Sequence, residues 1–170
     1  MFKKIILTLI FLLLFSKSLC AEEFQGKFAD WSVFKVNFGN KEICYMVSLP
    51  IKKDGNYYRR GEQYFLVVNS VDNIDEITIS SGYVYKDGSE VELSFGLKKF
   101  NGFTYKSLAW ANTKTDDIDI IKEMRRNLDV VVLGTNKNNK YSTDTYSLIG
   151  FNQAFGKMKE ICAEGVRNRD

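Results

Sequence analysis

The alternation of apolar and polar residues along this chain predicts mostly short β-strands. In a predicted strand over residues 31–38, Phe34, Val36 and Phe38 share one face while Lys35 and Asn37 face the other way. The segment 64–68 is continuously apolar, which is typical of a strand buried on both faces. The other predicted strands lie at 43–49, 76–80, 90–95, 130–133 and 141–149, with a further hairpin at 100–105 around Asn101-Gly102.

Two segments follow the helical period instead. Apolar residues recur every three or four positions over 116–128, where Asp116 or Asp117 is placed to cap the start, and again over 151–162. About eight short strands with two helices predict one mostly antiparallel β-sandwich. The two apolar helix faces comprise Ile118, Ile121, Met124 and Leu128, and Phe151, Phe155, Met158 and Cys162.

The first twenty residues have the layout of a secretory signal peptide. A basic start with Lys3 and Lys4 precedes an apolar run over 5–15, and small and polar residues follow up to Cys20. The apolar run is too short to span a membrane. We predict cleavage between Cys20 and Ala21, and lipidation of Cys20 is the alternative, although Leu19 fits a lipoprotein signal poorly.

The predicted cleavage sets the domain organisation. Residues 1–20 are the cleaved signal peptide, 21–27 a short polar lead-in, 28–165 a single β-sandwich domain and 166–170 a polar tail. The lysines of the leader account for the basic excess, because their loss leaves 21 basic against 21 acidic side chains. A neutral mature domain gives no reason to expect a nucleic acid partner, and the mature chain is predicted to have no transmembrane anchor.

Cysteine and histidine content restrict the chemistry. After cleavage Cys44 and Cys162 remain, an even pair in a compartment that permits disulfides, and we predict a bridge between them. Two separate buried thiols are the alternative. The chain has no histidine, which excludes Ser-His and Cys-His nucleophilic pairs and histidine-bearing metal sites. No Gly-rich phosphate loop or metal-spaced cysteine cluster is present, so no metal or cofactor is predicted.

Three groups of residues are candidates for binding. A charged hairpin could bind an anion or a partner, because guanidinium groups pair with phosphate or acidic glycans at two points; a solvated loop is the more common role of such a hairpin. An acidic group at 116–119 is read as a helix start rather than a cation site. Two tryptophans could form a sugar-stacking platform, but packing in the core and across strands is favoured for such aromatic residues. The residues are Lys52, Lys53, Tyr57, Tyr58, Arg59 and Arg60 in the hairpin, Asp116, Asp117 and Asp119 in the acidic group, and Trp31 and Trp110.

Several segments together resemble a known family. They occur in order over 30–34, 44–48, 59–67, 82–91, 109–111 and 143–151, for example Asp30-Trp31-Ser32-Val33-Phe34 and Ala109-Trp110-Ala111, and a cysteine follows near the C-terminus. In this order and spacing the chain resembles the invasion-associated locus B family of bacterial exported proteins. The resemblance implies an immunoglobulin-like β-sandwich in the periplasm or on the surface of a Gram-negative bacterium. It also supports Cys44 and Cys162 as partners, and it supplies no catalytic residues.

Two functions remain open at this stage. The first is a non-enzymatic envelope protein that binds another protein or an envelope glycan, with a link to host-cell interaction implied by the family. The second is a small periplasmic hydrolase that uses carboxylates without histidine. The missing histidine and the lack of a convergent acidic set favour the first.

Overall fold

The computed structural model describes residues 22–38, 41–69 and 74–167. The predicted leader and the cleavage position between Cys20 and Ala21 lie outside these residues, as does the end of the predicted tail at 168–170. Within them, eleven strands form one antiparallel sheet in the order β1-β2-β3-β5-β6-β9-β8-β7-β10-β11-β4. The strands are β1 (Glu22–Phe28), β2 (Trp31–Phe38), β3 (Lys41–Ser48), β4 (Lys52–Gly55), β5 (Tyr64–Asn69), β6 (Asp75–Ser80), β7 (Glu90–Phe95), β8 (Lys98–Tyr105), β9 (Leu108–Ala111), β10 (Asp129–Thr135) and β11 (Tyr141–Ser147).

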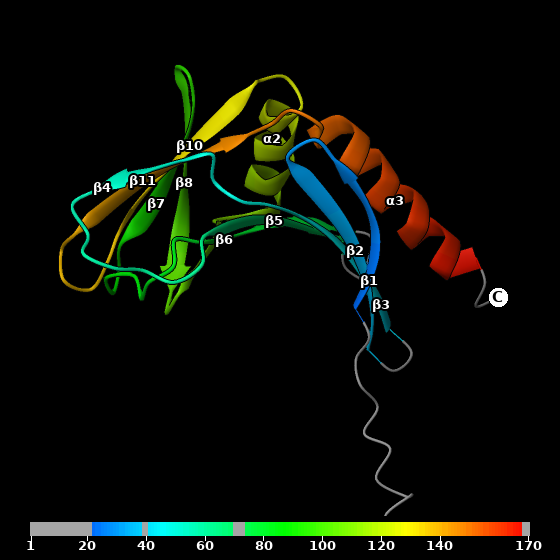
Figure 1. Cartoon of the computed structure of the whole chain (residues 1–170), viewed down its shortest axis with the longest axis horizontal. Helices are drawn as coiled ribbons and strands as arrows, with labels where there is room; N and C mark the ends of the chain where they lie inside the picture. The colour runs from blue at the N-terminus through cyan, green and yellow to red at the C-terminus, as the bar shows by residue number, and fades with distance from the viewer. Residues whose placement is uncertain (1–21, 39–40, 70–73, 168–170) are drawn as a thin grey trace, which may run out of the picture.

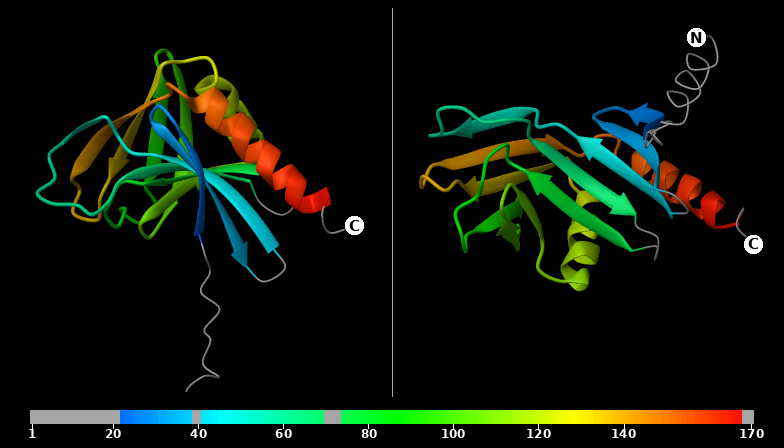
Figure 2. Two further views of the ribbon diagram at one scale, coloured as in Figure 1. Left: turned by 45° about the vertical axis from the view of Figure 1, so that its right-hand side comes forward. Right: turned by 90° about the horizontal axis from the view of Figure 1, so that it is seen from below.

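The sheet folds over on itself, so that its two halves enclose one core (Figure 1, Figure 2). Phe65 on β5 packs its ring 5.6 Å from that of Tyr146 on β11, although five strands separate β5 and β11 in the sheet. Trp31 at the start of β2 donates from Nε1 to the carbonyl oxygen of Ser147 at 2.9 Å. These contacts join the two halves face to face, as the predicted β-sandwich requires.

The bend lies where β6 meets β9. Only two residue pairs, Thr78 with Trp110 and Ile79 with Ala109, join these strands. On the far side of β9, Gly102 in the middle of β8 allows a close approach, because a Cβ there would lie 2.3 Å from the carbonyl oxygen of Trp110. The predicted turn at Asn101-Gly102 is therefore wrong: this glycine serves strand pairing, and β8 runs straight through it.

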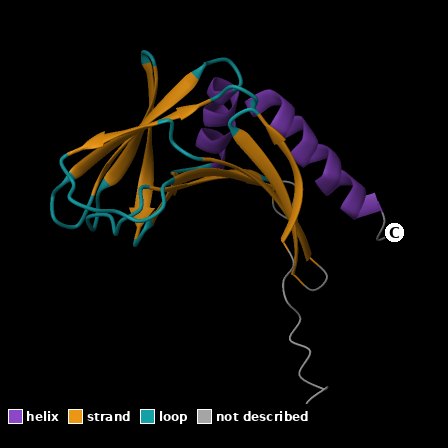
Figure 3. Ribbon diagram, viewed as in Figure 1, coloured by secondary structure: helices purple, strands orange, loops and turns teal. Residues whose placement is uncertain are grey.

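Both helices pack against the inner face of the sheet (Figure 3). Helix α2 (Lys114–Met124) contacts β6 and β9, and helix α3 (Phe151–Arg167) lies along β1, β2 and β3. Helix α2 buries Ile120, Ile121 and Met124, whereas Ile118 is 54% exposed and Leu128 lies beyond the helix. The predicted apolar face of this helix is thus rotated, because Ile120 rather than Ile118 faces the sheet.

Sequence periodicity located most of the longer elements and missed short strands. The expected lead-in at 21–27 is largely β1, which pairs with β2 through the backbone and also brings the Phe24 ring to 5.4 Å from that of Phe34. Lys52 and Lys53 of the charged hairpin belong to β4, a strand that the sequence pattern did not predict and that pairs with β11. Helix α3 continues through Arg167 and so extends into the region predicted as a polar tail.

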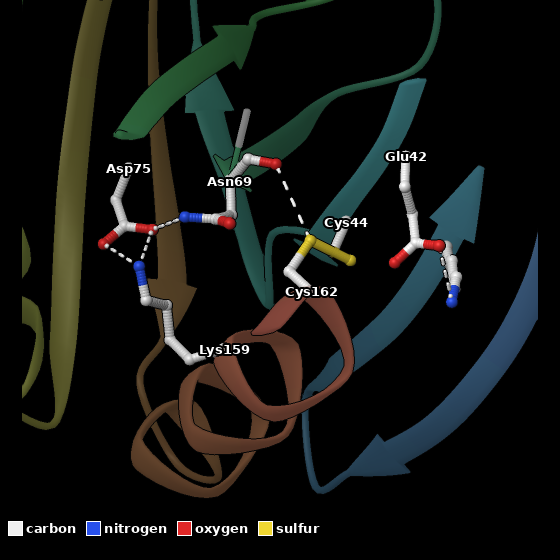
Figure 4. The surroundings of a disulfide bond; sticks show 7 residues. Glu42, Cys44, Asn69, Asp75, Lys159 and Cys162 are labelled. Atoms are coloured by element: carbon white, nitrogen blue, oxygen red, sulfur yellow. Dashed lines mark hydrogen bonds and ion pairs between the residues drawn. A yellow bond between two sulfur atoms is a disulfide. The ribbon is translucent and has the colours of Figure 1, made fainter. Parts of the chain in front are cut away.

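A disulfide fastens α3 to the sheet. Cys44 on β3 and Cys162 on α3 are bonded, with their Cα atoms 5.9 Å apart, as the sequence predicts (Figure 4). Beside the bridge, Lys159 on α3 forms an ion pair with Asp75 at 3.1 Å, and the Asn69 side chain donates to the same carboxylate at 2.7 Å. The C-terminal helix is therefore held by a covalent bond to β3 and by an ion pair with β6.

Candidate functional site

Arg60, from the predicted anion-binding hairpin, is buried in an ion pair with Asp144. Its two terminal nitrogens donate to the two carboxylate oxygens at 2.5 Å each, and the two side chains are 3% and 0% exposed. The Tyr57 ring lies against the guanidinium, 4.1 Å from centroid to Cζ, and its hydroxyl accepts a hydrogen bond at 3.0 Å. Burial by itself would lower the pKa of Arg60, but hydrogen bonding and attraction to Asp144 raise it, so the charge is retained. The hypothesis that Arg60 binds an external anion is wrong, because Asp144 already occupies its guanidinium.

The rest of that hairpin remains on the surface. Lys52 and Lys53 are exposed on β4, and Tyr58 is 92% exposed with the Arg59 guanidinium 5.7 Å from its ring centroid. The structure thus separates Arg59 from Arg60, one facing solvent and one facing the core. A role for Arg59 and the lysines in binding stays a prediction.

A cluster of tyrosine and serine hydroxyls surrounds the buried ion pair. Tyr83 is hydrogen-bonded to Ser142 and Tyr85 to Ser81, each at 2.7 Å. Burial raises the pKa of Tyr83, Tyr85 and Tyr146 above that of an exposed phenol, so these hydroxyls keep their protons at neutral pH. We interpret this cluster as a polar part of the core that fixes the packing of β11, since it offers neither a nucleophile nor a base.

The acidic group at 116–119 forms the start of α2. Thr113, rather than an aspartate, is the N-cap residue: its Oγ1 accepts from the backbone N–H of Asp116 at 3.1 Å. Asp119 pairs with Lys122 at 2.8 Å. In the described part of the chain no group of three or more cysteine and acidic side chains is arranged to hold a metal ion.

Asp117 differs from its neighbours because it is buried at the bend of the sheet. Its Oδ1 accepts a hydrogen bond from the backbone N–H of Ile77 at 2.8 Å. Ile77 is not among the residues of β6 that pair with β9, so Asp117 supplies the acceptor for this N–H. Burial raises the pKa of Asp117 to about 6, and the nearby carboxylates of Glu76 and Asp116 add to the rise while the bond from Ile77 opposes it. Since the folded state binds this proton more tightly than the unfolded chain does, ionisation of Asp117 costs stability as the pH rises through 6.

The two tryptophans have different surroundings and cannot form one platform. Trp31 is completely buried, with its ring 5.1 Å from that of Phe151. Trp110 is half-buried on β9 and stacks on Phe103 of β8, with ring centroids 5.4 Å apart and an interplanar angle of 23°. The platform hypothesis is therefore wrong for Trp31, which packs in the core, and only Trp110 remains available.

An apolar groove lies on the outer face of β2, β3 and β5. Along β5, Phe65, Val67 and Asn69 face the core and are almost fully buried, while Tyr64, Leu66 and Val68 face outward and are only half-buried. The groove has a volume of about 410 Å³. Its lining is apolar apart from one carboxylate and two phenolic hydroxyls, and comprises Glu22, Phe34, Val36, Ile43, Tyr45, Val47, Tyr64, Leu66 and Val68.

This groove explains why 64–68 is continuously apolar. Such a run predicts burial on both faces, and in the described residues only the face toward α3 is covered. Contiguous exposed apolar surface of this kind marks interaction sites in soluble proteins. The sequence contained the signal, but sequence alone could not say that one of the two faces would stay open.

The comparisons with known proteins concern the fold. No protein-family model matches the sequence, and no curated protein matches it. The crystal structure of invasion associated protein B from Bartonella henselae is similar, with a TM-score of 0.56 and 14% sequence identity over 80% of this chain and 96% of that chain. At this identity the similarity shows a shared fold. In the described residues, no helix is both long and apolar enough to cross a membrane.

Proposed function

We propose that this chain is an exported, non-enzymatic protein of the bacterial envelope that binds an apolar, extended segment of another protein in the groove on β2, β3 and β5. The single observation that carries the proposal is the half-buried apolar face of β5 opposite its buried face. A link to host-cell interaction is a further part of the proposal. Its support is the fold shared with an invasion associated protein, and nothing else in the chain bears on it.

The chemistry of the occupant follows from the edge of the sheet beside the groove. β1 is the terminal strand, and no described strand pairs with its outer edge. Its backbone therefore offers donors and acceptors to a polypeptide strand, while the partner's apolar side chains enter the groove. A lipid chain would use the groove but leave this edge unpaired, which favours a protein segment.

Two features support export. The leader has the composition of a signal peptide, and the disulfide between Cys44 and Cys162 is typical of oxidising compartments. Fractionation of cells, followed by N-terminal sequencing of the mature protein, tests this part: we expect a periplasmic or surface protein that begins at Ala21. A cytoplasmic protein that begins at Met1 would contradict it.

The carboxylates of the fold support a binding function over hydrolysis. Asp144 is held by Arg60, Asp119 by Lys122, and Asp117 bonds the backbone of Ile77. Most glycoside hydrolases use two carboxyl groups that flank the bond to be cleaved. Turnover of an ester and glycan panel that disappears in Asp117→Asn would overturn the non-enzymatic assignment.

Site-specific photocrosslinking tests the groove directly. Tyr45 lies in the groove and Tyr141 is a surface tyrosine on β11, so benzoylphenylalanine at each position gives matched aromatic probes. In the native bacterium we expect a discrete protein adduct from position 45 and none from position 141. Adding Leu66→Glu should remove the adduct, whereas Leu128→Glu, at a residue 78% exposed outside the groove, should leave it intact.

Three outcomes would overturn the proposal. The same adducts from both positions would mean that the groove is not selective. An adduct with the mass of a dimer would assign the groove to a second copy of this chain, and an adduct with lipid alone would assign it to an acyl chain. Circular dichroism of each variant establishes that a lost adduct does not reflect a lost fold.

A further inference from the structure

A second cleft lies beside the N-terminus of α2, at the bend of the sheet. Its volume is about 390 Å³, within the range of small-molecule sites. It is separate from the apolar groove, with which it shares no lining residue. Aromatic rings form one side, and charged side chains from β6 and α2 contribute to the rest. The side chains that define its chemistry are Phe103, Tyr105 and Trp110, with Glu76, Lys114 and Asp117.

The aromatic side is an ordered, accessible surface. Phe103 and Trp110 are directly opposite each other on β8 and β9, and their rings stack at 5.4 Å. Phe103 is 45% exposed and Tyr105, two residues along the same strand, is 63% exposed. Because Gly102 brings β8 and β9 close together, the backbone holds the two stacked rings in place. A preformed aromatic face favours a ligand with a flat, weakly polar side.

The charged side chains define what such a ligand must offer. Asp117 is 7% exposed; its Oδ1 is taken by Ile77, and no described residue bonds its Oδ2. Glu76 adds a second acceptor, and Lys114 a donor, at the same cleft. Both signs of charge are present in the cleft, so acceptors and a donor lie side by side. A neutral ligand whose groups both donate and accept fits all three.

We propose that this cleft binds a pyranose-based saccharide, with a sugar face on Phe103 and Trp110 and sugar hydroxyls bonded to the side chains of Asp117, Glu76 and Lys114. The carbon-bound hydrogens of a pyranose face supply the weakly polar side, and its hydroxyls supply donors and acceptors together. This site is independent of the apolar groove, so either can be wrong without the other.

The two tryptophans make the test selective. Trp31 is fully buried, so added ligand changes fluorescence emission mainly through Trp110. We expect chitotriose, maltotriose or cellotriose to change the emission of the mature protein saturably, at millimolar concentration or below. Isothermal titration should show that Trp110→Ala weakens binding by at least about tenfold. Tyr141→Ala, at an exposed aromatic residue on β11, should bind as the wild type does.

Asp117→Asn tests whether the saccharide bonds to this side chain or only stacks on the aromatic rings. The amide oxygen can still accept from Ile77, so the fold is maintained while the charge facing the ligand is removed, and we expect weaker saccharide binding. Binding that survives Trp110→Ala, or none of the three trisaccharides binding by titration, would overturn the proposal. Binding of tetramethylammonium in place of all three would assign the cleft to a cation instead. Leu66→Glu, in the apolar groove, should leave saccharide binding unchanged.

Discussion

Removing the disulfide should cost this protein a large share of its stability. The bridge joins residues 118 positions apart, and Cys44 and Cys162 are 0% and 9% exposed. In the chain-entropy model a closed loop of that length lowers the entropy of the unfolded chain by about 16 cal/mol/K, or about 4.9 kcal/mol at 25 °C. Domains of this size have total stabilities of about 5–15 kcal/mol. The open form should therefore be marginal.

Two perturbations distinguish the stability that comes from loop closure from the stability that comes from packing of the sulfur atoms. Reduction of the wild type opens the loop and keeps both sulfur atoms in the core, whereas Cys44→Ala/Cys162→Ala opens the loop and also removes sulfur. Urea unfolding followed by fluorescence should show a loss of about 2–5 kcal/mol in both, with the double variant slightly less stable. Helix α3 should still dock in the reduced protein, because Phe151, Ala154 and Met158 remain buried against the sheet.

The comparison of the two forms can refute this reasoning. A reduced wild type as stable as the oxidised protein, with only the double alanine variant weakened, would mean that packing rather than loop closure supplies the stability. Two free thiols on the untreated mature protein, labelled under denaturing and non-reducing conditions, would show that the bridge is absent altogether.

Three further predictions concern the buried charges and one turn. Arg60→Met should lower the free energy of unfolding by about 3–5 kcal/mol, because it leaves the buried Asp144 unpaired. The double variant Arg60→Met/Asp144→Leu should recover much of this loss, and losses that simply add in the double-mutant cycle would contradict the pairing. The pKa of Asp117 is about 6 in the folded protein against about 3.8 in the unfolded chain. The free energy of unfolding should therefore fall by about 1–3 kcal/mol from pH 4 to pH 8, and an Asp117→Asn variant should lack this pH-dependent fall. Gly150→Ala, where φ is +87° and a Cβ would lie 2.0 Å from a backbone oxygen at the end of β1, should lower the melting temperature more than Gly88→Ala, where φ is +70° and the space is open. Equal shifts for the two glycines would exclude the clash.

Local pattern was enough to find the elements that have a buried face of their own. The strands at 31–38, 64–68 and 90–95 and the helix from Phe151 were predicted because alternation, continuous apolar runs and helical spacing depend on neighbouring residues. β4 and β9 were missed, since each has only four residues. β4 depends on its pairing with β11, which is remote in sequence, whereas β9 pairs with β8 just before it in the chain. Gly102 was taken for a turn because Asn-Gly is a typical turn pair, and only the pairing of β8 with β9 shows that the glycine lies inside a strand.

The sequence by itself determined the β-rich class and the two helices, and it predicted the disulfide between Cys44 and Cys162. Only the tertiary structure decided which charges and which apolar faces are available. Arg60 and Arg59 are adjacent in sequence, yet Asp144, 84 residues away, draws one of them into the core. Likewise Leu66 and Phe65 are equally apolar, and only the packing of the sheet covers one and leaves the other facing the groove. Burial is set by contacts between distant segments, and composition and periodicity do not contain that information.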